Sequence, residues 1–367
     1  MNYTIDNTEN LISPSLVYYE DVIDKNIEKA LRTVGDVKLL WPHVKSHKTL
    51  ELVSKLINKG VTKFKCATIA ECEMVAQAGA SEILLAYPAV GPNLDRFLNI
   101  QSAFPKVHWY ALFDSLEFLQ LMSQKATAIN AKVDYFIDVN VGLNRTGVEA
   151  CKVLDFVKAC EDLSNVNLVG LHCYDGHNGI SDVNERLEAI KKLVDIENDL
   201  VCELKKLGHE VMVISGGTPE FPCYRQLSNF YVSPGTLFLQ DDGYSQAFKD
   251  MDYECACCIM SRCISHPNSE NFTLDCGTKA IASDPAVRGV IAGLEGKTEI
   301  VLQNEEHWVF KMKAGYEHLK PKVGDVLYVI PTHVCPTSAL YPYALVVKDH
   351  KVVGSWQIFA RNRKIIF

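Results

Sequence analysis

The sequence lacks any apolar run long enough to cross a membrane as a helix, so we expect no membrane partner. Its first six residues are mostly polar and lack the apolar core of a signal peptide, which favours a cytoplasmic protein. Basic residues are outnumbered, because 37 Lys and Arg face 45 Asp and Glu for a net charge of −8. Without a basic tract to offset this charge, nucleic acid is not expected as the main partner.

The 13 cysteines lack the regular spacing of a disulfide framework, which favours reduced thiols in the cytosol. A dense group of cysteines could suggest a metal cluster: Cys255, Cys257, Cys258 and Cys263. No second Cys-x-x-Cys pair follows at the spacing of a zinc ribbon or finger. We therefore interpret the group as small core residues on a strand.

Strand-like and helical patterns alternate from residue 16 to about 245. The predicted strands are Val37–Trp41, Lys63–Cys66, Glu82–Leu85, Val107–Leu112, Asp134–Asp138, Leu168–His172, Val211–Ser215 and Asn229–Ser233. The predicted helices are Leu50–Asn58, Thr68–Ala78, Ser115–Lys125, Glu149–Asp162 and Ser181–Lys206. This alternation is typical of βαβ units, and eight units in roughly 210 residues fit a closed (β/α)8 barrel.

The pattern changes after about residue 250, where short β-type runs are separated by Gly, Pro and Asn turns. The chain has 367 residues, which is long for one core. We therefore predict an α/β protein with a barrel over residues 15–245 and a β-rich domain over residues 246–367, joined by residues 1–14. The run Pro14–Tyr19 is expected to pair with the β-rich domain.

Lys45 follows the first predicted strand and lies between His43 and His47. A lysine in a crowded, cationic and partly desolvated site can form a Schiff base with an aldehyde. Lys48, about one helical turn further on, is expected to face a phosphate or solvent. For a lone lysine a basic surface loop is the more common explanation, so the rest of the chain must decide between the two interpretations.

Two glycine-rich stretches follow the seventh and eighth predicted strands, where barrels often bind phosphate. Their candidate phosphate-binding residues are Gly216, Gly217, Thr218, Gly235 and Thr236. Backbone N–H groups and threonine hydroxyls of such loops can converge on a phosphate. Together with the Lys45 amine and an arginine, they point to pyridoxal 5'-phosphate as the cofactor.

The chain resembles the fold-type III pyridoxal-phosphate enzymes that share the alanine racemase barrel, and within them the D-threonine aldolase and D-serine dehydratase branch. The resemblance is carried by Pro42–Lys48, Gly142–Gly147, Gly170–His177, Ser215–Pro219, Asp275–Lys279, Glu305–His307 and Thr332–Thr337. It implies that Lys45 carries the cofactor, that Arg145 lies near the cofactor O3' and that Tyr174 packs on the pyridine ring. It also implies a homodimer in which the β domain of one chain closes the barrel mouth of the other.

A possible metal motif, His333-Val334-Cys335, lies in the β-rich domain. On an extended segment, residues two apart face the same side, so the imidazole and thiolate could share one ion. Both are good zinc ligands, although a strand edge with a buried cysteine would look the same in the sequence. The resemblance favours a divalent metal here: His-x-Cys is typical of zinc-dependent D-serine dehydratases, whereas a carboxylate in place of the thiol suits manganese-like ions.

Two positions and one motif differ from those of related enzymes. Alanine racemase has an arginine at the position of Ser233, where it contacts the pyridine nitrogen, and a Gly-Tyr-Gly-Asp-Gly motif that is absent here. Both differences argue against racemisation. The arginine that usually precedes Pro-His-Val-Lys is replaced by Trp41, which leaves the substrate preference open.

The sequence supports a lyase that acts on a small D-3-hydroxy amino acid. The first hypothesis is a D-serine dehydratase that forms pyruvate and ammonia. The second is a D-threonine aldolase type of retro-aldol cleavage to glycine and an aldehyde, in which His177 is the candidate base for the β-hydroxyl proton. A racemase or a non-catalytic pyridoxal-phosphate protein is a lesser alternative. The β domain and the His333-x-Cys335 motif count against the non-catalytic protein.

Overall fold

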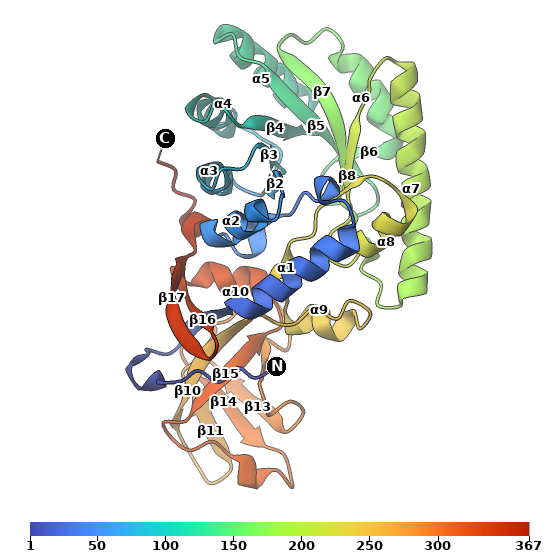
Figure 1. Cartoon of the computed structure of the whole chain (residues 1–367). Helices are drawn as coiled ribbons and strands as arrows, with labels where there is room; N and C mark the ends of the chain where they lie inside the picture. The colour runs from blue at the N-terminus through green and yellow to red at the C-terminus, as the bar shows by residue number, and fades with distance from the viewer. Residues whose placement is uncertain (367) are drawn as a thin grey trace. The chain divides into compact units, whose positions relative to one another are not determined.

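The computed structural model describes residues 1–366, and the chain divides into two compact units (Figure 1). The barrel unit contains Ala30–Gly235 and the described terminal residues 362–366. The β-rich unit contains Met1–Lys29 and Thr236–Arg361. Among the described residues, none of the helices combines the length and apolar character needed to span a bilayer.

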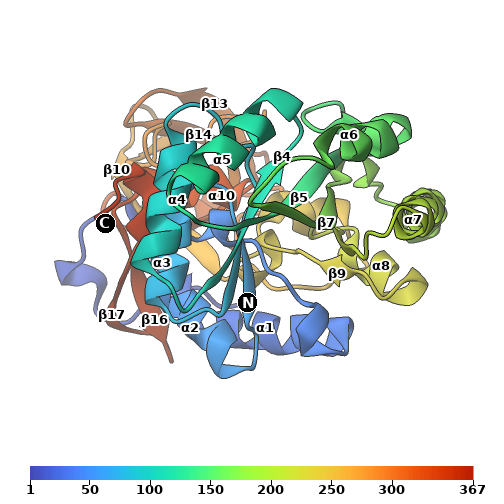
Figure 2. The same cartoon turned by 90° about the horizontal axis from the view of Figure 1, so that it is seen from above.

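The barrel unit is built on a parallel sheet with helices packed outside it (Figure 2). Its strands, in spatial order, are β2 (Lys63–Cys66), β3 (Glu82–Leu85), β4 (His108–Phe113), β5 (Val133–Asn140), β7 (Val166–Cys173), β8 (Met212–Ser215) and β9 (Tyr231–Val232), with the short β6 (Val148–Glu149) beside β5. Its helices are α2 (Leu50–Asn58), α3 (Ile69–Gln77), α4 (Asn93–Ala103), α5 (Leu116–Ala128), α6 (Val153–Cys160), α7 (Val183–Lys206) and α8 (Phe221–Leu227). The predicted ranges of β2, β3 and α2 are confirmed residue for residue.

The prediction of a regular strand at Val37–Trp41 is wrong. Val37–Leu39 forms a 3-10 helix, η2, because the Asp36 carboxylate accepts a hydrogen bond from Lys38 N at 3.0 Å. The next residues nevertheless join the two edges of the sheet, since Leu40 bridges β9 and His43 bridges Lys65 of β2. Pro42 has no N–H to donate, so the segment closes the barrel through isolated bridges and not through a continuous strand.

The barrel interior is filled by aromatic and aliphatic side chains. Trp41 is completely buried and packs edge-on against Tyr110 and Phe136, with ring centroids 5.4 Å and 5.8 Å away. Such edge-to-face contacts add about 0.5–1.5 kcal/mol each to the burial of the ring area. This packing holds the segment that contains Trp41 in place just before Lys45.

The β-rich unit is a mostly antiparallel sheet. Its main path runs β13 (Thr298–Gln303), β14 (Trp308–Met312), β11 (Asn271–Leu274), β10 (Cys257–Ser265), β1 (Ser15–Tyr19), β16 (Tyr343–Lys348) and β17 (Lys351–Gln357), and β15 (Val326–Pro331) joins β10 to β12 (Gly289–Ile291). The helices α9 (Asp242–Ala247) and α10 (Val334–Leu340) also belong here, and α1 (Glu20–Val34) begins here. Cys257, Cys258 and Cys263 are buried on β10, which confirms that they are core residues.

The division of the chain differs from the predicted boundaries at both ends of the barrel. Residues 15–29 group with the β-rich unit because β1 pairs with β10 and with β16, which also confirms the expected pairing of that strand. Residues 236–245 also group with the β-rich unit. The segment from Asn362 groups with the barrel, where Ile366 N donates to the buried carboxylate of Glu73 at 3.0 Å.

Candidate active site

A cavity of about 560 Å³ opens among the loops that follow the barrel strands. It is lined by His43, Lys45, Ala67, Ala86, Tyr87, Pro88, Val90, Leu112, Asp114, Asp138, Arg145, Thr146 and His172. Most of these residues lie at or just beyond the carboxyl ends of strands, where barrel enzymes place their chemistry. The cavity is therefore the candidate active site.

Lys45 lies on a short 3-10 helix, η3 (Val44–Ser46), which His43 caps by accepting a hydrogen bond from Lys45 N at 3.3 Å. Its Nζ is 5.8 Å from the ring centre of Tyr174, and the guanidinium carbon of Arg145 is 4.7 Å from the same ring. The three residues singled out for the cofactor thus lie together. Burial, followed by the charge of Lys45, holds the pKa of His43 well below its usual range, so this imidazole is neutral.

Lys48 does not face a phosphate or solvent. Its ammonium group pairs with the completely buried carboxylate of Glu71, which also accepts a hydrogen bond from Ala67 N at 2.6 Å. Glu71 lies in the first turn of α3, where Thr68 at the N-cap accepts a hydrogen bond from Glu71 N through Oγ1 at 3.1 Å. The ion pair of Lys48 with Glu71 therefore links the loop that carries Lys45 to α3.

A second lysine, Lys65, was missed in the sequence. It lies on β2 with only 3% of its surface exposed, donates to Ser233 Oγ and lies 3.3 Å from Nε2 of His172. His172 Nδ1 in turn lies 2.8 Å from Asp138, which also accepts from Thr146 Oγ1 at 2.6 Å. A lysine between Phe64 and Cys66 on a predicted strand was the available signal, because lysine is rarely buried without a purpose.

These groups have shifted pKa values. Burial, followed by the charge of Lys45, lowers the pKa of Lys65 to about 7. Burial and the charge of Lys65 lower the pKa of His172. Burial alone would raise the pKa of Asp138, but the hydrogen bonds from His172 and Thr146 outweigh it and lower the pKa. At neutral pH the chain of groups therefore holds an ionised Asp138, a neutral His172 and a Lys65 close to its titration point.

The predicted phosphate loops adjoin each other within the barrel unit as far as Gly235, whereas Thr236 groups with the β-rich unit. Gly235 N donates to Thr218 Oγ1 at 3.1 Å, and Ser233 N donates to the Gly216 carbonyl at 3.0 Å. Gly216 has a φ of 67°, which favours glycine, and a Cβ at Gly235 would lie only 2.6 Å from the His43 carbonyl oxygen. The loops form a tight cradle of backbone and hydroxyl groups, which fits a phosphate group.

Buried carboxyls lie beneath this cradle. The Asp175 pKa is raised to about 7 by burial, although the amides of Gly216 and Gly217 act in the opposite direction. Burial also raises the pKa of Glu197 to about 8 and that of Glu220 well above its usual range. Both oxygens of Asp175 lack a close hydrogen-bond donor, so the protonated form is favoured at this depth.

His177, the candidate base, lies on η5 (Gly176–Asn178) and is not among the residues that line the cavity. Its Nε2 is 3.1 Å from the Asn178 side-chain amide. It packs so close to Gly142 that a Cβ there would lie 2.7 Å from Nε2. The catalytic role of His177 stays a prediction.

In the β-rich unit, the assumption that His333 and Cys335 lie on an extended segment is wrong. His333 caps α10 and Cys335 lies in its first turn, because Asp241 accepts from Val334 N at 3.0 Å and Pro336 is compatible with a first helical turn. The two side chains still meet. Their hydrogen bond, followed by that of the Asp284 carboxylate, raises the pKa of His333 to about 9 against the effect of burial.

His333 and Cys335 together offer a nitrogen and a sulfur ligand to a metal ion. Asp284 Oδ2 lies 2.5 Å from His333 Nδ1, which leaves Nε2 for another partner, as in a carboxylate–histidine–metal arrangement. Thr236 Oγ1 lies 3.6 Å from Cys335 Sγ. Within residues 1–366 no group of three or more His, Cys, Asp or Glu side chains is arranged for a metal. The pair fits a site with two protein ligands and open positions for water or substrate.

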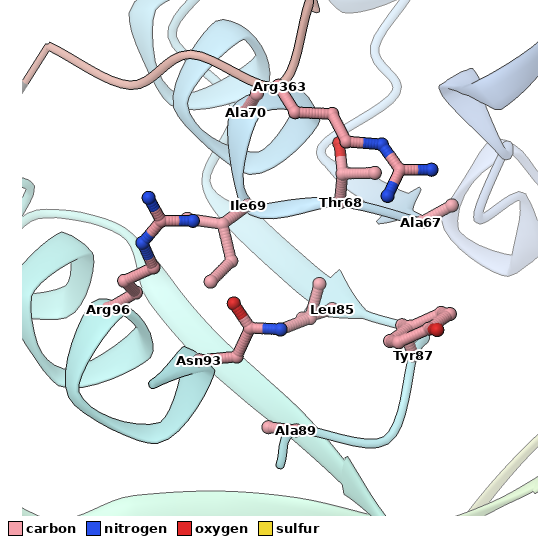
Figure 3. Close-up of a pocket in the computed structure, with 10 residues that line it drawn as sticks. All are labelled: Ala67, Thr68, Ile69, Ala70, Leu85, Tyr87, Ala89, Asn93, Arg96 and Arg363. Atoms are coloured by element: carbon pink, nitrogen blue, oxygen red, sulfur yellow. The ribbon is translucent and has the colours of Figure 1, made fainter. Parts of the chain in front are cut away.

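A smaller pocket of about 180 Å³ lies on the barrel unit and shares Ala67 and Tyr87 with the main cavity (Figure 3). Arg96 of α4 and Arg363 of the C-terminal segment reach its rim from opposite sides. Asn93 of α4 also lines the pocket. The polar character of this pocket distinguishes it from the more apolar cavity beside Lys45.

Residues 20–218 match the family described as "Alanine racemase, N-terminal domain", which is more than half of the chain, and the chain belongs to this family. Residues 256–347 match the "Putative serine dehydratase domain". These matches confirm the predicted family and the fold class of a barrel followed by a β-rich domain.

Named relatives extend over nearly the whole chain. A D-threonine aldolase from Arthrobacter sp. is 27% identical over 358 residues, which are 95% of this chain and 93% of the relative. A D-serine dehydratase from Dictyostelium discoideum is 22% identical over 97% of this chain and 99% of the relative. The structure of D-threonine aldolase from Filomicrobium marinum has a TM-score of 0.89 at 20% identity and covers 99% of both chains. The expectation of a lyase-type enzyme is confirmed.

Proposed function

We propose that the chain is a pyridoxal-phosphate- and metal-dependent lyase that converts D-serine to pyruvate and ammonia. The observation that carries the proposal is that Lys45 and Arg145 line one cavity and both lie close to the Tyr174 ring. The glycine cradle lies in the same barrel unit. The family is one of pyridoxal-phosphate enzymes, and its members named above act on D-3-hydroxy amino acids according to their names.

The cofactor, when bound, withdraws electrons from Cα of the substrate. Lys45 would hold its aldehyde carbon, Arg145 would face its phenolate oxygen, and Thr218 with the glycine amides would hold its phosphate. Lys45 Nζ is then the group that accepts the Cα proton. The Tyr174 ring lies close to both cationic side chains.

The metal, when bound to His333 and Cys335, polarises the β-hydroxyl of the substrate so that it leaves more easily. The soft thiol favours zinc over manganese, and Asp284 orients the imidazole for binding. This donor set is the specific reason to favour elimination of water over cleavage of the carbon chain.

Retro-aldol cleavage is the second candidate, because the D-threonine aldolase is the more similar of the two named relatives, at 27% against 22% identity. Purified protein with zinc or manganese should be given D-serine, D-threonine and D-threo-3-hydroxyaspartate. Pyruvate from D-serine supports the dehydratase, and glycine with an aldehyde supports the aldolase. Bound cofactor without turnover of any D-amino acid would contradict both and favour a non-catalytic carrier.

The proposed assembly is a homodimer, which rests on the resemblance to fold-type III enzymes. Light scattering of the purified holoenzyme should give twice the mass of the chain. A fully active monomer would contradict this assembly.

A further inference from the structure

Lys65 lies inside the barrel unit at a place that the proposed reaction leaves unused. It is 3% exposed, and its two hydrogen-bond partners are the Ser233 hydroxyl and the His172 imidazole. Lys63, two residues earlier on β2, instead pairs with Glu82. Holding a buried amine against uncharged partners is costly, so its presence needs a compensating role.

The direction of the hydrogen bonds around Lys65 follows from Asp138. The ionised Asp138 carboxylate lies 2.8 Å from His172 Nδ1, so Nδ1 carries the imidazole proton. His172 Nε2 is then an acceptor, and Lys65 Nζ, 3.3 Å away, donates to it. Asp138, His172 and Lys65 therefore form one oriented chain that ends at Ser233.

This chain lies directly beside the proposed cofactor lysine. The Nζ atoms of Lys65 and Lys45 lie 5.7 Å and 5.8 Å from the ring centre of Tyr174, and Asp138 and His172 line the cavity. The backbone of Lys65 also bridges that of His43, two residues before Lys45. Lys65 is thus a cation beside this site that is not assigned to the aldehyde or the phenolate oxygen.

We propose that Lys65 is a positioning residue of this site: held between Ser233 and His172, it presents a hydrogen-bond donor and a positive charge to the ring of the bound cofactor and thereby sets the cofactor's protonation state. The proposal rests on the proposed function, since it assumes that pyridoxal phosphate occupies the cavity. The sequence has no arginine at Ser233, and the Ser233 hydroxyl serves here as an acceptor for the lysine.

Several charged groups face Lys65 and decide how it titrates. Burial and the charges of Lys45 and Arg145 lower its pKa, whereas Asp175 and Asp138 raise it, with a result of about 7. His43 and His172 also adjoin it, and both have lowered pKa values. Lys65 is therefore charged below neutral pH and loses its proton just above it.

The test is a pH titration of the cofactor absorbance in the holoenzyme without substrate. A nearby cation disfavours protonation, so Lys65→Met should raise the midpoint of the cofactor linkage by roughly one pH unit, a tenfold change in proton affinity. Lys65→Arg keeps the charge and should restore a midpoint close to that of the parent. Lys63→Met, on the same strand, is the matched control and should not move it.

A second measurement uses the unaltered chain, in case Lys65→Met does not fold. The lysine ε-carbon resonance of Lys65, assigned through Lys65→Arg, should shift when pyridoxal phosphate is added to the apo protein. An unmoved resonance, or a Lys65→Met midpoint equal to that of the parent, would overturn the inference while the proposed function stands. A parent protein that takes up no pyridoxal phosphate would overturn both.

Discussion

Lys48 is ion-paired with Glu71, whose carboxylate is completely buried at the start of α3. This ion pair gives the two lysines of the run Pro42–Lys48 different roles. Lys48 is held by a carboxylate, whereas Lys45 extends toward Tyr174 at the cavity.

Borohydride reduction of the holoenzyme, followed by peptide mass mapping, should place the pyridoxyl group on Lys45. Lys45→Ala should fold and bind cofactor only reversibly, because the amine that attacks the aldehyde is gone. Label found on Lys48 or on Lys65 would contradict the assignment.

Lys48→Met should lower the free energy of unfolding by about 3–5 kcal/mol, because it leaves the buried Glu71 without its cation. The measurement is urea unfolding of the apo protein. The double variant Lys48→Met with Glu71→Gln should recover part of the loss. A single variant as stable as the parent would show that the pair is dispensable.

Gly217→Val should weaken retention of pyridoxal phosphate strongly while the protein stays folded. A Cβ at Gly217 would lie 3.0 Å from Glu220 Oε2 and 3.3 Å from the Tyr174 ring, so the loop must shift. Gly354→Val is the control, because a Cβ there meets nothing within 4 Å. Equal cofactor affinity in both variants would argue against a phosphate at this loop.

Chelation should abolish turnover without releasing the cofactor, and Cys335→Ala should lose most of the metal but keep the cofactor absorbance. Cys335→Asp should shift the preference from zinc toward manganese-type ions. Asp284→Asn should weaken metal binding by about 10–100-fold, because the carboxylate orients His333. The exposed Cys202 provides a control as Cys202→Ala; normal metal content and D-serine turnover in Cys335→Ala would place the metal elsewhere.

The pH dependence of stability should carry a contribution from Glu197. Its pKa rises from 4.5 to about 8 on folding because of burial, so between these values only the unfolded chain gives up the proton. The free energy of unfolding therefore falls as the pH rises through this window. Glu197→Gln cannot ionise and keeps an acceptor for Ser215 and Tyr224, so its decline between pH 5 and 8 should be smaller by on the order of a few kcal/mol. The exposed Glu188→Gln on the same helix should decline like the parent.

The sequence was sufficient for the features that depend on local pattern. The strands β2 and β3 and the helix α2 follow from the local pattern of apolar residues, and all three were predicted with their observed bounds. Lys65 was missed because a strand's alternation says which residues share a face but not that the face meets Ser233 and His172 from distant strands. The helical start at Cys335 was also missed, because it depends on a hydrogen bond from Val334 to Asp241, more than ninety residues away.

Bridges at Leu40 and His43 close the barrel, and amide hydrogen exchange can report on this closure in solution. Trp41 N donates to the Val232 carbonyl at 2.8 Å and His43 N donates to the Pro234 carbonyl at 3.0 Å. Both amides therefore lie on the seam where the two edges of the sheet meet. Because Lys45 follows two residues later, a molecule attached to it tethers this seam to the loops around the cavity. Deuterium uptake at the Trp41 and His43 amides should therefore slow on cofactor loading before it changes in the outer helices.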